Sequence, residues 1–565
     1  MLGKHPAKKQ GADFWQVGTF LVAGLAIMPI LAIAYLAFFP KENIWPHLFA
    51  TSLPTYVSST FILMLGVGTS IFLTGVSTAY LVSNYQFPGR RVFEWLLLLP
   101  LAMPAYVIAY VYTDFLEFAG PVQSSLREWF GWSLASDYWF PAIRSMGGAV
   151  TLMGLVLYPY VYMLARAAFL EQSSSTLEVS RLLGRGPIKT FLTVSLPIAR
   201  PAIAVGVALG LMETLNDFGT IDFFAVKTLT AGLYDVWLGM GNLGAAAQIA
   251  MTMLAFVVLL LSLEYFGRRK QGFYQSEQRF KEKQRQVLTG RWKWIGFLTC
   301  AVPVTLGFIL PFILLLQLAW AYFDVSWTSE FRRYALNSIG LSLVAALVTV
   351  SIAIVIAYTR RLKKGKKLLI ASRAASLGYA VPGAVLAIGV IVPFAAFDNG
   401  LDAFMRETFN ISTGLLLSGT LFAVVFAYVV RFLAVSIGSV ESSLSKVSES
   451  MDMAAQTMGY SRLNILRKFH LPLIKGGILT ASLVVFVDCM KELPATLILR
   501  PFNFETLATH VYQFASDEMI GESALGALFI VLAGLLPVIL ISRTIGRTSF
   551  LGRKQNTPKP SGIKT

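Results

Sequence analysis

The sequence predicts an all-α integral membrane protein with about twelve transmembrane helices in two six-helix repeats. Three observations support this prediction: an apolar composition, a series of long apolar stretches and an internal repeat. Of the 565 residues, 56% are hydrophobic and 14% are charged, whereas about 25% are charged in a typical soluble domain. The net charge of +17 indicates basic cytoplasmic loops in a membrane protein, so no nucleic-acid partner is expected.

Twelve stretches are long and apolar enough to cross a bilayer, for which a helix needs about 20 mainly apolar residues. In the first half of the chain they are 15–39, 52–83, 95–113, 145–165, 201–224 and 241–263. In the second half they are 294–323, 334–359, 374–397, 408–430, 476–499 and 523–542. Pro104 and Pro382 interrupt the third and ninth stretches, where a kink is expected.

The distribution of positive charge predicts the orientation of these helices. Most of the 47 Lys and Arg residues lie at the termini and in alternate loops, on one side of the predicted membrane. Because positively charged loops stay in the cytoplasm, both termini are expected to be cytoplasmic. The sequence therefore predicts a multi-pass protein embedded in membrane lipid.

An internal repeat relates the two halves of the chain at an offset of 278 residues. Three segments align at this offset: Ser59–Thr60 with Asn337–Ser338, Pro104 with Pro382, and Thr228–Leu229 with Thr506–Leu507. Each copy holds six crossings, so the copies have the same orientation and are related by an axis along the membrane normal. The predicted domains are residues 1–275 and 294–565, joined by a charged cytoplasmic linker at 276–293.

Composition argues against several kinds of chemistry. The two cysteines, Cys300 and Cys489, lie in apolar stretches, so neither a disulfide framework nor a thiolate metal cluster is expected. The four histidines are scattered, which argues against haem or zinc. No catalytic residue and no bound cofactor are therefore predicted for this chain.

One cytoplasmic loop in each half has the same pattern, at 171–200 and at 440–475. A short helical segment ends at a glycine that allows a sharp turn, and a Leu-Pro pair begins the next membrane helix. The first loop contains Glu178, Gly184, Leu196 and Pro197, and the second contains Ala454, Ala455, Gly459, Leu471 and Pro472. This pattern resembles the EAA loop of ABC-transporter permeases, although Met453 stands where glutamate is expected.

The resemblance implies that the two loops dock on a cytosolic ATPase. The chain has no G-x-x-x-x-G-K-S/T phosphate-binding loop, so it is not expected to hydrolyse ATP itself. Two copies of a separate ATPase subunit, which carries the ATP and magnesium, are the implied partners. A plain connecting loop is the alternative, but two copies at equal spacing favour the coupling role.

The helices that follow the two loops carry ionisable residues at membrane depth. Counted from the loop prolines, Glu213 and Asp488 are both sixteen residues on, and Asp217 and Glu492 are both twenty on. A spacing of four is expected to place each pair on one helical face. Charge inside a membrane is costly and usually lines a substrate path, and Asp222 is a fifth candidate for that path.

Two interpretations of these residues remain open. Hard carboxylate oxygens suit a hard metal cation, so Glu213, Asp217, Asp488 and Glu492 are candidate transient metal ligands. Alternatively, Lys491 neutralises one acid and the others cap irregular backbone near Pro494, which would make their role structural.

The segments around these acids, 212–220 and 487–509, resemble the fused, two-repeat permeases of bacterial ferric-iron ABC importers. That family implies a type I importer fold in the bacterial inner membrane, a periplasmic binding protein and ferric ion as substrate. Fused thiamine permeases share much of the pattern, so thiamine or another small organic cation is an alternative cargo. A proton-coupled secondary transporter is a further alternative, against which the paired coupling loops argue.

Overall fold

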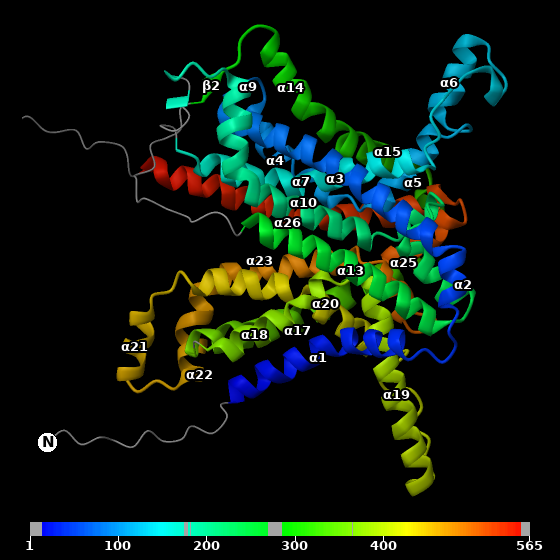
Figure 1. The fold of residues 1–565 in the computed structure, drawn as a ribbon, viewed down its shortest axis with the longest axis vertical. Coiled ribbons are helices and arrows are strands. Elements are labelled where there is room, and N and C mark those ends of the chain that lie inside the picture. The colour runs from blue at the N-terminus through cyan, green and yellow to red at the C-terminus, as the bar shows by residue number, and fades with distance from the viewer. Residues whose placement is uncertain (1–13, 174–178, 181, 269–284, 364, 555–565) are drawn as a thin grey trace, which may run out of the picture.

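The computed structural model describes residues 14–173, 179–180, 182–268, 285–363 and 365–554, with only the backbone given for 263–268 and 540–554. This part of the chain is almost entirely helical (Figure 1). The exception is a pair of two-residue parallel strands, β1 (Tyr85–Gln86) and β2 (Gln286–Val287), which join the two halves. The all-α prediction is confirmed. Half of the predicted linker, 276–284, lies outside the described residues.

The first half contains α1 (Phe14–Phe38), α2 (Trp45–Ala50), α3 (Leu53–Asn84), α4 (Arg90–Leu96), η1 (Leu99–Ala102), α5 (Ala105–Leu116), α6 (Pro121–Phe130), η2 (Ala135–Asp137), α7 (Met146–Glu171), α9 (Pro187–Thr190), η3 (Phe191–Ser195), α10 (Leu196–Asn216), α11 (Gly219–Phe223), α12 (Leu229–Tyr234), η4 (Asp235–Gly239) and α13 (Leu243–Arg268). The second half contains α14 (Arg291–Val304), η5 (Thr305–Ile309), α15 (Leu310–Ala321), α16 (Phe323–Ser326), α17 (Ser329–Leu362), α18 (Lys366–Ala375), η6 (Leu377–Ala380), α19 (Gly383–Phe409), α20 (Leu421–Leu444), α21 (Glu449–Thr457), α22 (Arg462–Ile465), η7 (Leu466–His470), α23 (Leu471–Met490), α24 (Pro494–Leu499), α25 (Leu507–Ser516) and α26 (Ile520–Lys554).

Among the described residues, eleven helices are long and apolar enough to cross a bilayer, and a bent pair makes a twelfth. The bent pair, Arg90–Ala102 with Ala105–Phe130, turns by 91° and replaces the kinked third helix predicted at 95–113. Met103 adopts an extended conformation before Pro104, because the residue that precedes a proline avoids the helical region. The kink expected at Pro104 is therefore a complete break.

The predicted repeat is visible in equivalent hydrogen bonds between a side-chain hydroxyl and a backbone amide. In the first half the Thr60 hydroxyl accepts a hydrogen bond from the Leu229 amide at 2.9 Å, and in the second half the Ser338 hydroxyl accepts one from the Leu507 amide at 2.6 Å. Pro104 and Pro382 each stand between a 3₁₀ turn and the next helix. These shared contacts confirm the alignment at 278 residues.

The two halves are interleaved in space. One apolar core joins α3, α5 and α7 of the first half to residues of the second half such as Cys300 in α14 and Val531 in α26. The other core joins α19 and α20 to residues of the first half such as Ile33 in α1 and Ile249 in α13. The first helix of each repeat therefore packs against the other repeat, which ties the halves together.

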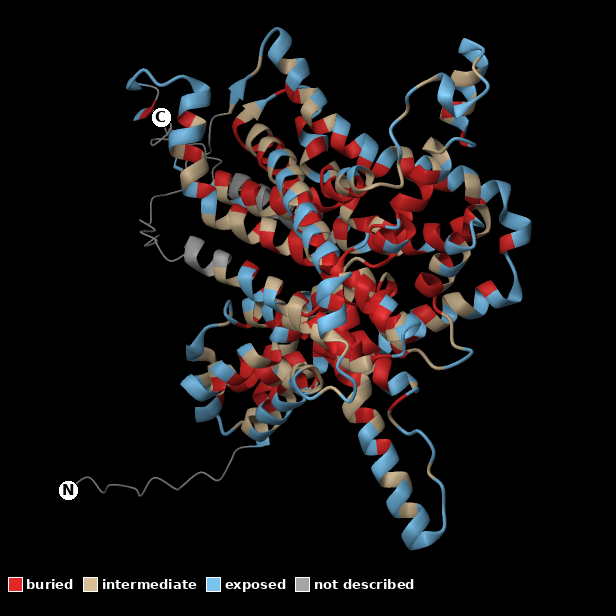
Figure 2. Ribbon diagram, turned by 45° about the vertical axis from the view of Figure 1, so that its right-hand side comes forward, coloured by how far each residue is buried: buried red, intermediate tan, exposed pale blue. Residues whose placement is uncertain are grey.

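The molecule has two distinct ends. Helix α9 of the first loop and helices α21 and α22 of the second project at one end, while α2, α6 and α25 lie at the other (Figure 1). Buried residues concentrate where the helices meet, and exposed residues cover the outer helix faces and the projecting segments (Figure 2). Large apolar side chains are exposed on these faces, including Leu65 and Leu347, as expected for surfaces that contact lipid.

Candidate functional site

A cavity of about 100 Å³ lies between helices of both repeats, with room for several water molecules. Its walls come from α5, α7 and α10 of the first half and from α20, α23 and α24 of the second half. Six charged side chains line it: Glu213, Asp217, Arg431, Asp488, Lys491 and Glu492. The structure thus brings four of the five predicted pathway acids to one space.

The cavity lies where two membrane spans break. Helix α10 ends at Asn216 and α11 begins at Gly219, while α23 ends at Met490 and α24 begins at Pro494. A methyl group on Gly219 would approach the Tyr106 Cβ to 2.7 Å, so only glycine allows this close packing. The prediction that each acidic pair shares the face of one continuous helix is wrong, because the chain leaves the helix between the two acids.

Asp217 and Glu492 cap the short helices that follow these breaks. The Asp217 carboxylate accepts a hydrogen bond from the Thr220 amide at 2.8 Å, and the Glu492 carboxylate accepts one from the Ala495 amide at 3.2 Å. These acceptors satisfy amides that have no partner within the helix. The structure therefore gives both acids the capping contact considered above as the structural alternative.

Two cations partly neutralise the acids. The Lys491 ammonium lies 2.9 Å from the Asp488 carboxylate, and the Arg431 guanidinium lies 3.5 Å from the Glu492 carboxylate. Arg431 also donates to the Asn216 side-chain oxygen at 2.8 Å, which links the two repeats. Four carboxylates against two cations leave the cavity with an acidic excess.

Sequence reasoning missed Arg431. The tenth span was predicted to end at 430, which placed Arg431 in a cytoplasmic loop, but α20 runs from Leu421 to Leu444 and buries this arginine. The signal for the true helix start is Thr420, whose hydroxyl accepts from the Phe422 amide. It is the counterpart of Ser145, which caps α7 in the first repeat.

Asp222, the fifth predicted pathway residue, does not line this cavity. It lies on α11 and accepts a hydrogen bond of 2.6 Å from the Tyr512 hydroxyl of α25. Helix α25 belongs to the second repeat, so this contact also joins the halves. Asp222 therefore lies nearer the end of the molecule that is opposite the two predicted coupling loops.

The acids do not form a preassembled metal site. In the part of the chain that the structure describes, no three His, Cys, Asp or Glu side chains are arranged to hold a metal ion. The four predicted ligands surround one space. Asp217 and Glu492 cap helices, and Asp488 and Glu492 each have a cationic neighbour.

Over the residues that the structure describes, the two predicted coupling loops have equivalent backbones. Gly184 and Gly459 have φ angles of +75° and +81°, a region that favours glycine. A π-helical turn, η3 or η7, then precedes the Leu-Pro pair that begins α10 or α23. Ala455 is buried and Ala454 is exposed. Glu178 lies outside the described residues.

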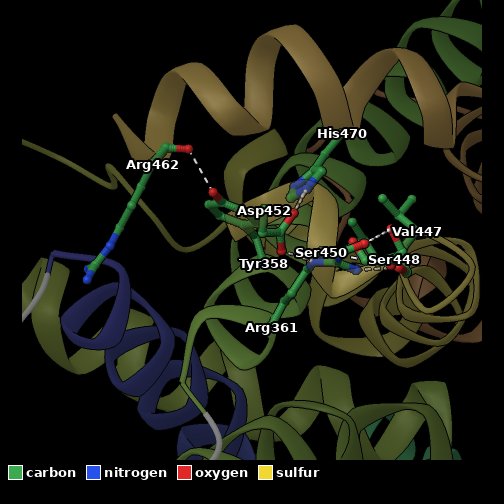
Figure 3. Close-up of polar contacts among 9 residues, drawn as sticks. Tyr358, Arg361, Val447, Ser448, Ser450, Asp452, Arg462 and His470 are labelled. Carbon is green, nitrogen blue, oxygen red and sulfur yellow. Dashed lines mark hydrogen bonds and ion pairs between the residues drawn. The ribbon is translucent and has the colours of Figure 1, made fainter. Parts of the chain in front are cut away.

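The second loop is fastened to α17 by a polar cluster (Figure 3). Asp452 accepts a hydrogen bond of 2.7 Å from the Arg361 guanidinium and lies 2.6 Å from the His470 ring nitrogen. Arg361 also donates to the carbonyl oxygens of Val447 and Ser448. The loop and α17 are therefore held together by buried and half-buried charged groups.

The family profile for "binding-protein-dependent transport system inner membrane component" matches residues 71–272 and 349–548, one copy in each repeat. The chain belongs to this family. It is accordingly a multi-pass inner membrane component of a transport system, as its apolar helices also indicate. Both matches include a predicted coupling loop and the acidic segment that follows it.

Several relatives are similar to this chain in sequence. The chain is 26% identical over 509 residues, 88% of its length, to the Fe(3+)-transport system permease protein FbpB 2 of Haemophilus influenzae, covering 91% of that protein. It is 23% identical over 93% of its length to the ferric transport system permease protein FbpB of Actinobacillus pleuropneumoniae, covering 78% of it. The Escherichia coli molybdenum transport system permease protein ModB is 27% identical over 201 residues, 34% of this chain and 84% of that protein.

Proposed function

We propose that this chain is the membrane subunit of an ATP-driven importer that carries ferric iron into the cytoplasm. The observation that carries the proposal is the similarity to two ferric permeases over 88% and 93% of the chain, through both repeats. The acidic excess of the central cavity supports a cationic cargo. A trivalent ion would lose hydration water on entering the cavity, and the carboxylates would compensate for that loss.

The driving force would come from partner subunits. Two copies of a cytosolic ATPase, with ATP and magnesium, would dock on the loops at 171–200 and 440–475, one on each. A periplasmic binding protein would deliver the cargo at the opposite end, which holds α2, α6 and α25 (Figure 1). This arrangement requires both termini to be cytoplasmic, in agreement with the distribution of Lys and Arg.

The loop geometry suggests how ATP binding reaches the cavity. Each loop passes directly into the helix that carries one acidic pair, α10 or α23. Each of these helices ends at a break beside the cavity, so movement of a loop would be transmitted along a rigid helix to the cavity wall. Of the four acids, Glu213 and Asp488 lie on these helices and do not cap the next one, which makes them the principal candidates to meet the ion.

The proposal is tested by uptake in cells deleted for this gene and then supplied with it again. Labelled ferric iron, thiamine and molybdate are measured in parallel, because thiamine is the alternative cargo considered above and a molybdenum permease is among the relatives. Restoration of iron uptake alone is the expected result. Restoration of thiamine or molybdate uptake without iron uptake would assign another cargo to the same machine.

A further inference from the structure

A row of buried hydroxyl groups lies on one face of α5. Tyr106, Tyr110 and Thr113 are spaced by four and three residues, which places them on one side of a helix. Their exposed fractions are 5%, 2% and 0%, and none of the three hydroxyl groups has a hydrogen-bond partner in the described structure. Buried polar groups are normally paired, so three unpaired ones in a row need an explanation.

Packing of the helix does not require these hydroxyl groups. The repeat aligns Tyr106, Tyr110 and Thr113 with Ala384, Ile388 and Ile391 of α19, at the same offset of 278 residues. Ala384 and Ile388 are also buried, so the equivalent helix packs well with apolar side chains. Because burial of an unpaired hydroxyl is unfavourable, the polar groups are retained in the first repeat at a cost that packing does not explain.

The row begins at the central cavity. Tyr106 lines the cavity together with Asp217 and Glu492. Tyr110 lies one helical turn further along α5, with its ring 5.9 Å from that of Tyr106 between centroids.

Tyr110 contacts α11, the short helix through which the first repeat meets α25 of the second. The Tyr110 ring packs edge-on against Phe223 of α11 at 4.6 Å between centroids, and Asp222 on the same short helix accepts the Tyr512 hydroxyl. Tyr106 and Tyr110 therefore lie on α5 between the cavity and α11, the short helix that carries Asp222.

We propose that Tyr106 and Tyr110 line the outer half of the cargo path and supply oxygen contacts to the hydrated cation between Asp222 and the central cavity. The inference rests on the proposed function and adds a site to it. Phenol oxygens are hard donors that can replace water molecules around a small, highly charged ion. The unpaired state of both hydroxyls is explained if water or the passing ion is their partner.

The test removes the hydroxyl groups and keeps the rings. Cells carrying Tyr106→Phe, Tyr110→Phe or the double variant are compared for uptake of labelled ferric iron at limiting concentration, normalised to the amount of protein in the membrane. Tyr158→Phe is the matched control, because this hydroxyl is also buried and unpaired but belongs to α7 and does not line the cavity. Each single change is expected to lower iron uptake, and the double change to lower it about tenfold, which corresponds to loss of a hydrogen bond to a charged partner.

The outcomes separate this inference from the proposed function. Iron uptake by the wild type, with a tenfold loss in the double variant and none in Tyr158→Phe, supports the path. Normal iron uptake in the double variant would overturn the path while leaving the cargo assignment intact. An equal loss in Tyr158→Phe would also overturn it, since general core damage would then explain the effect. Absence of iron uptake by the wild type would overturn the cargo assignment itself.

Discussion

Replacement of Arg431 by methionine is expected to destabilise the protein strongly, because it strands a buried negative charge. Arg431 and Glu492 are both 5% exposed, and their charged groups are 3.5 Å apart. Arg431 also holds the Asn216 oxygen at 2.8 Å across the repeat boundary. The Arg431→Met variant keeps most of the side-chain volume and removes both contacts.

The size of the effect follows from the burial of both partners. At an effective dielectric constant of about 20, two unit charges at this separation attract by about 5 kcal/mol. Removal of one member of a buried pair typically costs about 3 to 5 kcal/mol. Glu492→Gln in the same chain removes the stranded charge, and its amide oxygen can still accept from the Ala495 amide. The double variant is therefore expected to recover at least about 2 kcal/mol of that loss.

The assay is a double-mutant cycle on protein purified in detergent, with thermal or denaturant unfolding of Arg431→Met, Glu492→Gln and the double variant. Arg406→Met serves as the control, because the Arg406 side chain is 62% exposed in its ion pair with Asp402. That exposed pair is expected to contribute less than about 1 kcal/mol. A cycle in which the two changes simply add would refute the assignment of a coupled buried pair.

Three further predictions follow from the cavity and the loops. Glu213→Gln combined with Asp488→Asn should lower iron uptake at least about tenfold, because the two negative charges are lost while the size and polarity of the side chains are kept. The ATPase should still co-purify with this variant. Unchanged uptake would exclude these acids from the path. Gly219→Ala should destabilise the protein by about 1 to 3 kcal/mol, because the new methyl group would lie 2.7 Å from the Tyr106 Cβ. Normal thermal stability of this variant would contradict the close packing of Gly219 on Tyr106. Gly459→Val should weaken co-purification with the ATPase, because the φ of +81° at this position of the loop is unfavourable for a β-branched residue. Membrane insertion should be unchanged. Full recovery of the ATPase would argue against a docking role for this loop.

The fold could be predicted because its signals are local and repeated. A bilayer requires long apolar helices, and the residue pairs Thr60 with Ser338 and Leu229 with Leu507 recur at an offset of 278 residues. These features depend on sequence spacing alone. The interleaving of the cores could not be predicted, because the packing of α1 on α19 depends on the tertiary arrangement.

The candidate site was only partly predictable, for two physical reasons. Asp217 and Glu492 could be placed by counting from the loop prolines, but the counting assumed an unbroken helix and so missed their capping contacts. Arg431 escaped because hydropathy ends a predicted span at the first charge, whereas this charge is compensated by Glu492 from another helix. Partners that are distant in sequence determine whether a charge can be buried, and hydropathy does not contain that information.

ATP-dependent transport in proteoliposomes tests the central claim most directly. The purified chain is reconstituted with its ATPase and its binding protein loaded with labelled ferric iron, and ion accumulation is followed with ATP, without ATP, and with a proton gradient alone. The account predicts accumulation of iron only with ATP and magnesium, and its loss in the Glu213→Gln, Asp488→Asn variant. Accumulation driven by the proton gradient alone would contradict the account, and so would ATP-driven transport that excludes iron.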